Sequence, residues 1–597
     1  MPVNPFNPMV VQSDHTVLLE VDNPSYAEAR DALARFAELE KSPEHIHTYR
    51  LSPLSLWNAA ASGLGAEAIV DALTRYSKYD VPGNIQADVR DYVSRFGRLK
   101  LRKGETGDLL LSSDDALLML EVSRQRKVRQ FILEEIDAHT VRVNPAMRGH
   151  VKKALVDVGF PAEDLAGYVD GAPLSLTLLP AMRRTAQPFS LRHYQQEAVD
   201  IFHAQGSARG GSGAIVLPCG AGKTVVGIGV IGQLQTNTLI LTTNTVAVRQ
   251  WIDELHDKTS LERDMIGEYT GDSKEIRPVT ITTYQILTYR ERRKRGSALE
   301  EFWEDDFDQD NQEDGPLTPA VYPHFGIFQQ RDWGLIIYDE VHLLPAPVFR
   351  MTAELQARRR LGLTATLVRE DGKEDHVFAL IGPKKYDVPW KDLERQGWIA
   401  TAHCHEIRLD MNQERRLLYA LAGPREQAII AATDPAKLPV VEQIIAKHRD
   451  DQVLVIGTYL EQLDQIAAQL NAPLLTGKTP VRERQKLYQQ MREGTLRCLV
   501  VSKVANFAID LPDVSVAIEV SGTFGSRQEE AQRLGRILRP KQDNRPAHFY
   551  AIVMRDTKDQ IFGAKRQMFL TEQGYKYEIL YADDLAAYSP ELDHATW

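Results

Sequence analysis

Short runs of aliphatic and β-branched residues alternate with helical patterns from about residue 191 onward. The runs are AIVLP (214–218), TLILTT (238–243), VTITT (279–283), LIIYDE (335–340), VLVIG (453–457), RCLVVS (497–502) and VSVAIEVS (514–521). Continuous apolar strands separated by helices are typical of parallel sheets that are covered on both faces. The pattern therefore predicts two doubly wound α/β domains, at 187–395 and 438–597, each of ordinary domain size.

The first hundred residues follow a different pattern. Apolar residues recur at helical spacing over 26–41 and 66–76, and Asn23-Pro24-Ser25 is a suitable helix start. We therefore expect a helical N-terminal domain over 1–100.

Residues 101–186 mix both kinds of pattern. Short strands are expected at 109–113 and 141–145, and a helix around 147–158. These elements predict a small α+β domain. The segment 183–190 has the composition of a linker to the first α/β domain.

The composition excludes several classes of protein. Of the 597 residues, 43% are hydrophobic and 26% are charged, which is typical of a folded globular protein and too apolar for general disorder. No apolar run reaches the roughly 18–20 residues that span a bilayer, and the first residues do not resemble a signal peptide. Three cysteines are too few for a disulfide framework. We expect a cytoplasmic protein without a membrane partner.

The net charge of −11 does not argue against a nucleic-acid partner. Nine acidic residues lie between Glu300 and Asp314, and the rest of the chain carries a formal charge of only −2. Phosphate binding depends on local potential rather than on net charge. We interpret 297–323 as an acidic, solvated insertion in the first α/β domain.

A glycine-rich turn follows the strand at 214–218 and opens the next helix. Its residues are Leu217, Pro218, Cys219, Gly220, Ala221, Gly222, Lys223 and Thr224. Strand, turn and helix in this order are the context of a phosphate-binding loop, in which backbone N–H groups approach the phosphates. Lys223 is expected to reach the β- and γ-phosphates, and the Thr224 hydroxyl to bind Mg²⁺. The strict pattern has glycine where Leu217 stands.

An acidic pair ends the strand at 335–340. Asp339 and Glu340 emerge at the carboxyl end, the edge at which α/β sheets bind ligands. Asp339 is expected to hold Mg²⁺, and Glu340 to orient or deprotonate the attacking water. Seen alone, such a pair is more often simply solvated, so this interpretation depends on the phosphate loop in the same domain.

A basic helix pattern lies in the second α/β domain. Gln532, Arg536 and Arg539 fall on one helical face at spacings i, i+4 and i+7. Two guanidinium groups on one face could contact the γ-phosphate across a cleft between the domains. A solvent-exposed basic helix is the alternative.

Together, these three motifs resemble the core of superfamily 2 helicases, whose phosphate loop tolerates a residue other than glycine at Leu217. The resemblance implies two RecA-like motor domains in tandem, and it makes His342 part of the DExH box. It gives Gln195 a role in adenine recognition. It also implies nucleic-acid contact or coupling for Arg249 and Thr283, for Thr364 and Thr366, and for Asp510.

The sequence is more narrowly similar to the XPB-type DNA repair helicases. The triplet Arg369-Glu370-Asp371, the loop LPCGAGKT, the DEVH box and AQRLGRILRP carry this resemblance, and 44–64 and 555–575 extend it. In that family, 101–186 corresponds to a damage-recognition domain and 396–437 to a short thumb-like or linker segment.

The resemblance implies an ATP- and Mg²⁺-dependent helicase that moves 3′→5′ and opens duplex DNA in nucleotide excision repair. DNA junctions would be the substrate, a repair nuclease a partner, and the nucleoid the location. An ATP-switched remodeller of duplex DNA that separates no strands has the same motifs and stays open as the alternative.

The run His403-Cys404-His405 is not expected to bind metal. Alternate side chains of a strand point to opposite faces, and no second cluster completes a tetrahedral site.

Overall fold

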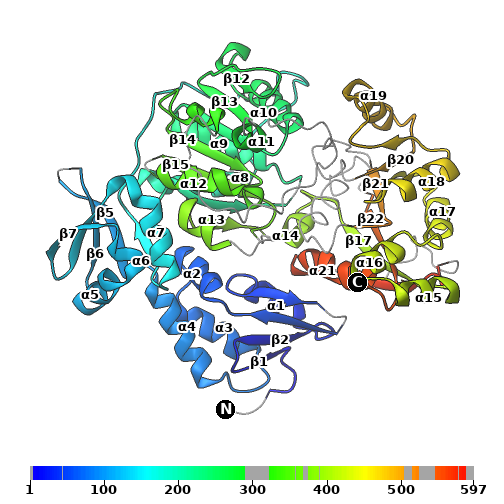
Figure 1. Cartoon of the computed structure of the whole chain (residues 1–597), viewed down its shortest axis with the longest axis horizontal. Helices are drawn as coiled ribbons and strands as arrows, with labels where there is room; N and C mark the ends of the chain where they lie inside the picture. The colour runs from blue at the N-terminus through cyan, green and yellow to red at the C-terminus, as the bar shows by residue number, and fades with distance from the viewer. Residues whose placement is uncertain are drawn as a thin grey trace, which may run out of the picture.

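The computed structural model describes four domains. It covers residues 4–42, 45–105, 107–218, 220–289, 322–356, 358–367, 374–388, 390–502, 514–522, 545–573, 575 and 577–585. In Figure 1 the N-terminal domain is blue, the small α+β domain is cyan, the first α/β domain is green, and the second α/β domain runs from yellow to red.

The N-terminal domain contains an antiparallel sheet as well as helices, so the prediction of a helical domain was incomplete. The sheet has the order β1-β2-β4-β3. The predicted helix over 26–41 is wrong in its last part, because Leu39 pairs with Tyr49 across β3 and β4 and both side chains are buried. The elements are β1 (Met9–Val11), β2 (Thr16–Glu20), α1 (Tyr26–Leu33), β3 (Glu38–Lys41), β4 (Ile46–Arg50), α2 (Pro53–Ala61), α3 (Ala66–Tyr76) and α4 (Gly83–Arg95).

The small α+β domain is a five-stranded sheet of order β7-β8-β6-β5-β9. Alternate residues of β6, among them Leu109 and Leu111, join the core with residues of α5 and α7. The elements are β5 (Leu99–Lys103), β6 (Leu109–Ser113), α5 (Ala116–Arg124), α6 (Arg126–Arg129), β7 (Ile132–Asp137), β8 (Thr140–Val143), α7 (Arg148–Asp157) and β9 (Ala162–Asp164). The strand expected at 109–113 and the helix expected at 147–158 are β6 and α7.

The first α/β domain is built on a parallel sheet of order β12-β13-β11-β14-β15-β10-β16. Its central strands are fully buried, as continuous apolar runs predict. Its strands are β10 (Ser212–Val216), β11 (Thr238–Thr242), β12 (Ile266–Tyr269), β13 (Val279–Thr283), β14 (Leu335–Asp339), β15 (Arg359–Thr364) and β16 (Lys384–Asp387). Its helices are α8 (His193–His203), α9 (Lys223–Leu234), α10 (Thr245–Lys258), α11 (Tyr284–Thr288), α12 (Ala346–Glu354), α13 (Glu374–Leu380) and α14 (Trp390–Arg395).

The second α/β domain repeats this plan with a parallel sheet of order β19-β20-β18-β21-β22-β17-β23. Its strands are β17 (Ala402–Leu409), β18 (Gln452–Ile456), β19 (Leu474–Leu475), β20 (Cys498–Val501), β21 (Val514–Glu519), β22 (Ala547–Met554) and β23 (Tyr577–Tyr581). Its helices are α15 (Gln413–Leu421), α16 (Pro424–Ala432), α17 (Lys437–Lys447), α18 (Leu460–Leu470), α19 (Val481–Arg492) and α21 (Lys558–Glu572).

The segment 396–437 is not a separate thumb or linker. Strand β17 lies within the second sheet, where it pairs with both β22 and β23. Helix α16 packs against α21 and β22 of the same domain. The second α/β domain therefore begins before residue 438, because β17 finds its partners more than a hundred residues later in the chain.

The expected linker at 183–190 is held against the first α/β domain. The Arg183 backbone N–H donates to the Asp257 carbonyl at 3.0 Å, and its side chain pairs with Glu262 at 3.0 Å. The Lys258 ammonium lies over the Phe189 ring, 5.7 Å from its centroid. This connection is therefore a packed turn.

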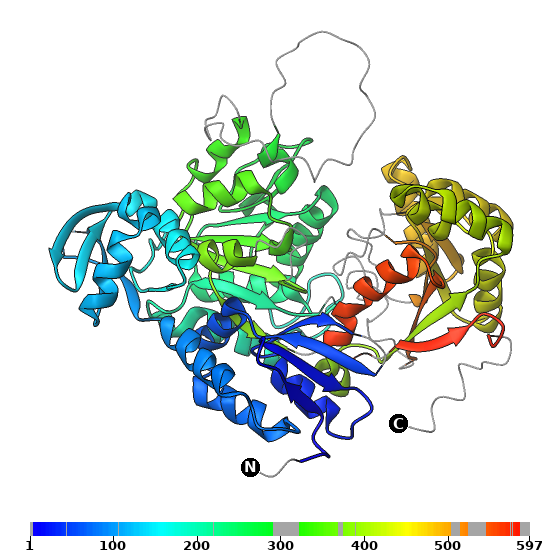
Figure 2. The ribbon, with the colours of Figure 1, turned by 60° about the horizontal axis from the view of Figure 1, so that its bottom comes forward.

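The N-terminal domain contacts both α/β domains (Figure 2). Trp57 of α2 packs against Phe378 of the first α/β domain, and α2 also contacts β16. On the other side, Met568 of α21 joins the N-terminal core, where α21 contacts β3. The two α/β domains also meet directly, because the Gln573 side chain accepts a hydrogen bond from the Trp390 backbone at 3.3 Å.

Candidate active site

The glycine-rich turn lies between β10 and α9, at the carboxyl edge of the first parallel sheet. Gly220 and Gly222 have φ values of +83° and +82°, a backbone conformation that glycine adopts without strain. Helix α9 begins at Lys223, so its first N–H groups and its positive dipole end face the turn. Leu217 is fully buried and its N–H donates to the Thr364 carbonyl at 3.0 Å, which explains why a core residue occupies this position.

Lys223 and Glu340 form an ion pair at this edge of the sheet. The Lys223 Nζ lies 3.3 Å from Glu340 Oε1, and both side chains are largely buried. Glu340 has φ +52°, an unusual conformation for a residue other than glycine. Its Oε2 is buried without a hydrogen-bond partner in the part of the chain that the structure describes. A carboxylate oxygen with unused acceptor capacity is suited to receive a proton or a hydrogen bond from water.

The pKa values of the two adjacent carboxyl groups are shifted in opposite directions. Removal from water and the neighbouring Glu340 carboxylate raise the pKa of Asp339 to about 6. Burial disfavours the Glu340 carboxylate too, but the Lys223 ammonium and His342 hold the pKa of Glu340 below its usual range. Glu340 is therefore ionised at neutral pH, as a water-orienting group requires.

Asp339 is held from two neighbouring segments, one at its carboxyl group and the other at its backbone carbonyl. Its Oδ2 accepts a hydrogen bond from the Trp251 indole at 2.8 Å, and its backbone carbonyl accepts one from the Tyr284 hydroxyl at 2.9 Å. Neither Trp251 nor Tyr284 was singled out from the sequence. Both lie within two residues of Arg249 or Thr283, for which the resemblance implies nucleic-acid contact, but only the folded chain brings them to Asp339.

The residues at this edge fit a magnesium ion bound together with phosphates. Asp339 and Thr224 carry the hard oxygen donors that Mg²⁺ prefers, and Glu340, which follows Asp339 in the sequence, has unused acceptor capacity at its Oε2. No group of three or more His, Cys, Asp or Glu side chains among the described residues could hold a metal ion alone. Mg²⁺ bound together with phosphates takes one or two protein ligands and several phosphate and water oxygens.

His342 connects the acidic strand to the neighbouring strand β15. Its Nδ1 lies 2.6 Å from Thr364 Oγ1, and both side chains are buried. Thr364 Oγ1 in turn accepts a hydrogen bond from the Thr366 N–H at 3.2 Å. The DEVH box and the Thr-Ala-Thr segment are therefore in direct contact.

Gln195 fixes the glycine-rich turn from α8. Its Nε2 donates to the Ala221 carbonyl at 2.9 Å, and its Oε1 accepts from the Arg192 N–H at 3.0 Å. The Tyr194 hydroxyl donates to the same Ala221 carbonyl at 2.7 Å. A Cβ added to Gly222 would lie 2.5 Å from Gln195 Nε2, so this contact also requires glycine.

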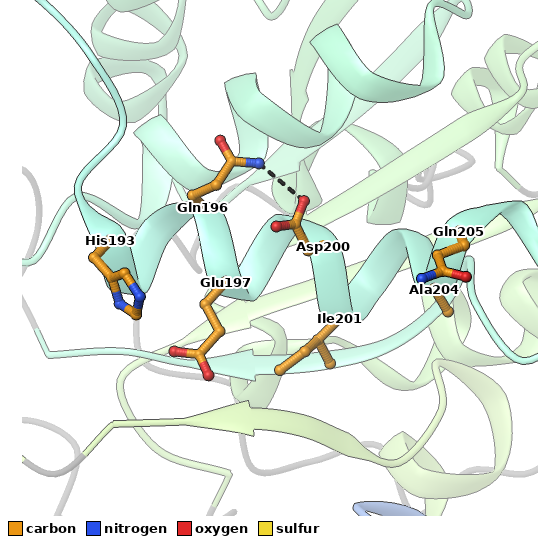
Figure 3. A pocket seen from close by; sticks show the side chains of 7 residues that line it. All are labelled: His193, Gln196, Glu197, Asp200, Ile201, Ala204 and Gln205. Atoms are coloured by element: carbon orange, nitrogen blue, oxygen red, sulfur yellow. Dashed lines mark hydrogen bonds between the residues drawn. The ribbon is translucent and has the colours of Figure 1, made fainter.

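The outer face of α8 carries a shallow hollow of about 550 Å³ that is separate from this site. Figure 3 shows its lining side chains, among them Gln196 and Asp200, which are joined by a hydrogen bond of 2.9 Å. Gln195, in contrast, is buried and contacts the glycine-rich turn. The hollow contributes no residue to the predicted site.

The residues expected to contact nucleic acid differ in exposure. Arg249 is half-exposed and pairs with Asp272 at 3.6 Å. Thr283, Thr364 and Thr366 are all buried, and the Thr283 hydroxyl caps α11 by accepting from the Ile286 N–H at 3.3 Å. Of these four residues, Arg249 has an exposed side chain, whereas the three threonines are buried among their neighbours.

Three family models match the chain. The ERCC3/RAD25/XPB C-terminal helicase model matches residues 393–595, the type III restriction enzyme res subunit model matches 188–369, and a helicase conserved C-terminal domain model matches 9–137.

Curated relatives match almost the whole chain. The DNA 3′-5′ helicase XPB of Kineococcus radiotolerans is 53% identical over 98% of both chains. That of Mycobacterium tuberculosis is 53% identical over 97% of this chain and 98% of its own. This chain belongs to the XPB helicase family.

More distant XPB proteins also match most of the chain. The general transcription and DNA repair factor IIH helicase/translocase subunit XPB of Enterocytozoon bieneusi is 31% identical over 96% of this chain and 92% of its own. The XPB C-terminal model begins at residue 393, within α14 and before β17.

Several XPB-type residues predicted from the sequence lie outside the described residues. These are Cys219, Arg369, Glu370, Asp371, Asp510, Gln532, Arg536 and Arg539, together with most of the acidic insertion 297–323. Within the described ranges, no helix is long and apolar enough to cross a membrane.

Proposed function

We propose that this chain is an ATP-dependent DNA helicase of XPB type that moves 3′→5′ and opens duplex DNA in nucleotide excision repair. The observation that carries the proposal is the ion pair of Lys223 with Glu340 beside Asp339, at the carboxyl edge of the first sheet. Membership of the XPB family supports DNA as the substrate, because the bacterial relatives are named DNA 3′-5′ helicases.

The side chains divide the reaction between them. Lys223 and the N-terminal amides of α9 bind the phosphates. When ATP binds, the Lys223 ammonium leaves Glu340 and moves toward the γ-phosphate. Glu340 then orients the attacking water and takes its proton. Thr224 and Asp339 hold Mg²⁺, which when bound neutralises charge on the phosphates. Arg536 and Arg539 of the second α/β domain are assigned to contact with the γ-phosphate, and Gln532, at the spacing expected for one helical face, is assigned to the same group.

The hydrogen bonds around Thr364 pass the state of the nucleotide to the DNA-contacting surface. The Thr364 carbonyl accepts from Leu217 in the phosphate loop, and its hydroxyl contacts His342 in the DEVH box. The triplet Arg369-Glu370-Asp371 follows a few residues later in the chain. A change at the phosphates is therefore transmitted through β15 to the triplet, which acts in strand separation, while Asp510 links DNA contact to nucleotide state in the second domain.

The alternative is an ATP-switched duplex-DNA translocase that separates no strands. Distant members of the family are named helicase/translocase subunits. A strand-displacement assay run beside a triplex-displacement assay distinguishes the two, because displacement of a triplex strand without unwinding favours the translocase.

The ATPase rate tests the substrate and the site together. The rate is compared with single-stranded DNA, duplex DNA and RNA at matched salt, since phosphate contacts are salt-dependent. Lys223→Ala is expected to remove most turnover, whereas Lys41→Ala, at an exposed position of the N-terminal domain, should leave it unchanged. Near-normal ATPase activity of the Lys223 variant, or stimulation by RNA alone, contradicts the proposal.

A repair nuclease partner and association with the nucleoid belong to the same proposal. Both follow from the XPB resemblance. Co-purification of a nuclease activity with the tagged full-length chain tests the first, and fractionation with chromosomal DNA before and after nuclease digestion tests the second.

A further inference from the structure

Trp251 links the helix α10 to the metal-binding carboxyl group. Its side chain is 1% exposed, and its Nε1 donates to Asp339 Oδ2 at 2.8 Å, although the two residues are 88 positions apart in the chain. An indole N–H can only donate, so it requires this oxygen as an acceptor and restrains the carboxyl group from rotating.

The indole ring is seated against the helix of the phosphate loop. A Cβ added to Gly227 of α9 would lie 2.5 Å from the Trp251 Cη2 atom, so the absence of a side chain at Gly227 makes room for the ring. Lys223 and Thr224 form the first turn of the same helix. One side chain thus contacts both the phosphate-loop helix and the acidic strand.

The opposite side of α10 faces away from the core. Arg249 lies two positions before Trp251, which turns the two side chains about 200° apart around a helix. In agreement, the Arg249 side chain is 49% exposed whereas Trp251 is buried. A displacement of α10 on binding of nucleic acid to Arg249 would therefore also displace the group that holds Asp339.

We propose that Trp251 is a positioning residue that orients Asp339 for Mg²⁺ and couples this orientation to nucleic-acid contact on α10. The inference rests on the proposed function, since it assumes that Asp339 takes part in binding Mg²⁺ with ATP. In other proteins, loss of a residue that hydrogen-bonds to a metal ligand lowers metal affinity about 10- to 100-fold. We expect an effect of this size on Mg²⁺ binding when the Trp251 donor is removed.

The test is Trp251→Phe, which keeps an aromatic ring beside Gly227 but loses the N–H donor. Binding of a non-hydrolysable ATP analogue is measured by calorimetry across a Mg²⁺ titration. We expect the Mg²⁺ concentration for half-maximal effect to rise about 10-fold, with Mg²⁺-free binding unchanged within twofold. Single-stranded DNA is expected to tighten Mg²⁺-dependent binding in the wild type and to do so less in the variant.

Trp333→Phe is the matched control. Trp333 is fully buried in the same domain, just before the amino end of β14, and its Nε1 donates to the Ile327 carbonyl at 2.9 Å rather than to a residue of the site. This variant also loses a buried indole donor, and it should keep the wild-type Mg²⁺ dependence. Thermal unfolding of the two variants shows whether their losses in stability are similar.

Two further variants keep the test decisive if Trp251→Phe folds poorly. Gly227→Ala adds the Cβ that must displace the indole, and it should shift the Mg²⁺ dependence in the same direction. In an Asp339→Asn background, Trp251→Phe should add no further effect, because coupled residues are not additive.

Wild-type Mg²⁺ dependence in both Trp251→Phe and Gly227→Ala, or an equal shift in Trp333→Phe, overturns the positioning role. A full DNA response in Trp251→Phe, or none in the wild type, overturns the coupling. Failure of the proposed function has a separate signature, because the wild-type chain itself would then show no Mg²⁺-dependent ATP binding and no DNA-stimulated ATPase activity.

Discussion

His342 and Thr364 contact each other side chain to side chain, with 2.6 Å between Nδ1 and Oγ1, beneath the surface of the first α/β domain. His342 lies three residues after the end of strand β14, and Thr364 ends the neighbouring strand β15. Because the Thr364 carbonyl also accepts a hydrogen bond from Leu217 in the glycine-rich turn, this contact lies between that turn and the segment that leads to Arg369-Glu370-Asp371.

Thr364→Val tests whether this contact transmits hydrolysis. Valine keeps the shape but loses the hydroxyl, and loss of one buried hydrogen-bonding group costs about 1–3 kcal/mol. We expect nucleotide affinity to stay within threefold, ATPase activity to fall a few-fold, and strand displacement to fall about 10-fold. Thr352→Val, at another fully buried threonine of the domain, is the control. A parallel loss of both activities would place Thr364 in the hydrolysis step itself.

Glu340→Gln should separate binding from hydrolysis. The amide keeps the volume of the carboxylate but cannot take a proton from water, and general-base catalysis contributes about 10²–10⁴-fold in rate. ATP binding should therefore persist while kcat falls at least 100-fold. Single-turnover hydrolysis measures the chemical step, and Glu354→Gln at an exposed position controls for loss of an acidic charge. Substantial turnover in Glu340→Gln would remove Glu340 from the role of base.

Asp164→Asn should destabilise the junction of the small α+β domain with the first α/β domain. Asp164 pairs with Arg148 at 2.6 Å and with Lys152 at 3.2 Å, and Lys152 also donates to Gln356 of the first α/β domain at 3.0 Å. Burial and the nearby Arg360 and Arg148 cations lower the pKa of Lys152 to about 7 despite Asp164. Removing the charge of one partner in a buried ion pair typically lowers the free energy of unfolding by about 3–5 kcal/mol.

Urea unfolding of the Asp164 variant checks this value. Asp157→Asn is the control, because its ion pair with Lys127 is longer, at 3.4 Å, and more exposed, and it should cost less than about 1 kcal/mol. Equal and small effects of the two substitutions would mean that the buried cluster adds no stability.

The stability of the second α/β domain should fall in mild acid because of His548. Burial, and then the neighbouring His448, His405 and His403, lower the pKa of His548 from 6.5 to about 2. The folded domain therefore keeps this ring neutral, whereas the unfolded chain binds a proton as the pH falls through 6.5. The linkage predicts a loss of about 1.4 kcal/mol between pH 7.5 and pH 5.5, with stability fully present above pH 6.5.

The two acids beside this cluster of histidines do not mask this effect. Asp451 contacts His448 at 3.0 Å and Glu578 contacts His405 at 3.1 Å, and the pKa values of both acids lie below their usual range, so they titrate below the window. Hydrogen exchange of the β22 amides, corrected for the intrinsic rate at each pH, measures the loss. His548→Asn should abolish the difference and His193→Asn, at an exposed position, should not. If His548→Asn keeps the full wild-type pH dependence, the loss of stability in acid comes from other groups.

Local patterns in the sequence were enough for the family and for the α/β architecture. The strand, the glycine-rich turn and the helix around Lys223 follow one another within a few residues, as do β14 and the pair Asp339-Glu340. Periodicity and turn chemistry act over such short distances, so these features can be interpreted without a fold. Because continuous apolar strands are buried on both faces in parallel sheets, the sequence also predicted two such sheets.

The features that only tertiary structure decided join residues far apart in the chain. Strand β17 looked like part of a linker because its partners β22 and β23 follow more than a hundred residues later. The contacts of Trp251 with Asp339 and of Lys152 with Gln356 depend on how helices and whole domains pack. Such contacts are set by the complementary shapes of buried surfaces, as in the space that Gly227 leaves for the indole ring, and no spacing within a single segment encodes them.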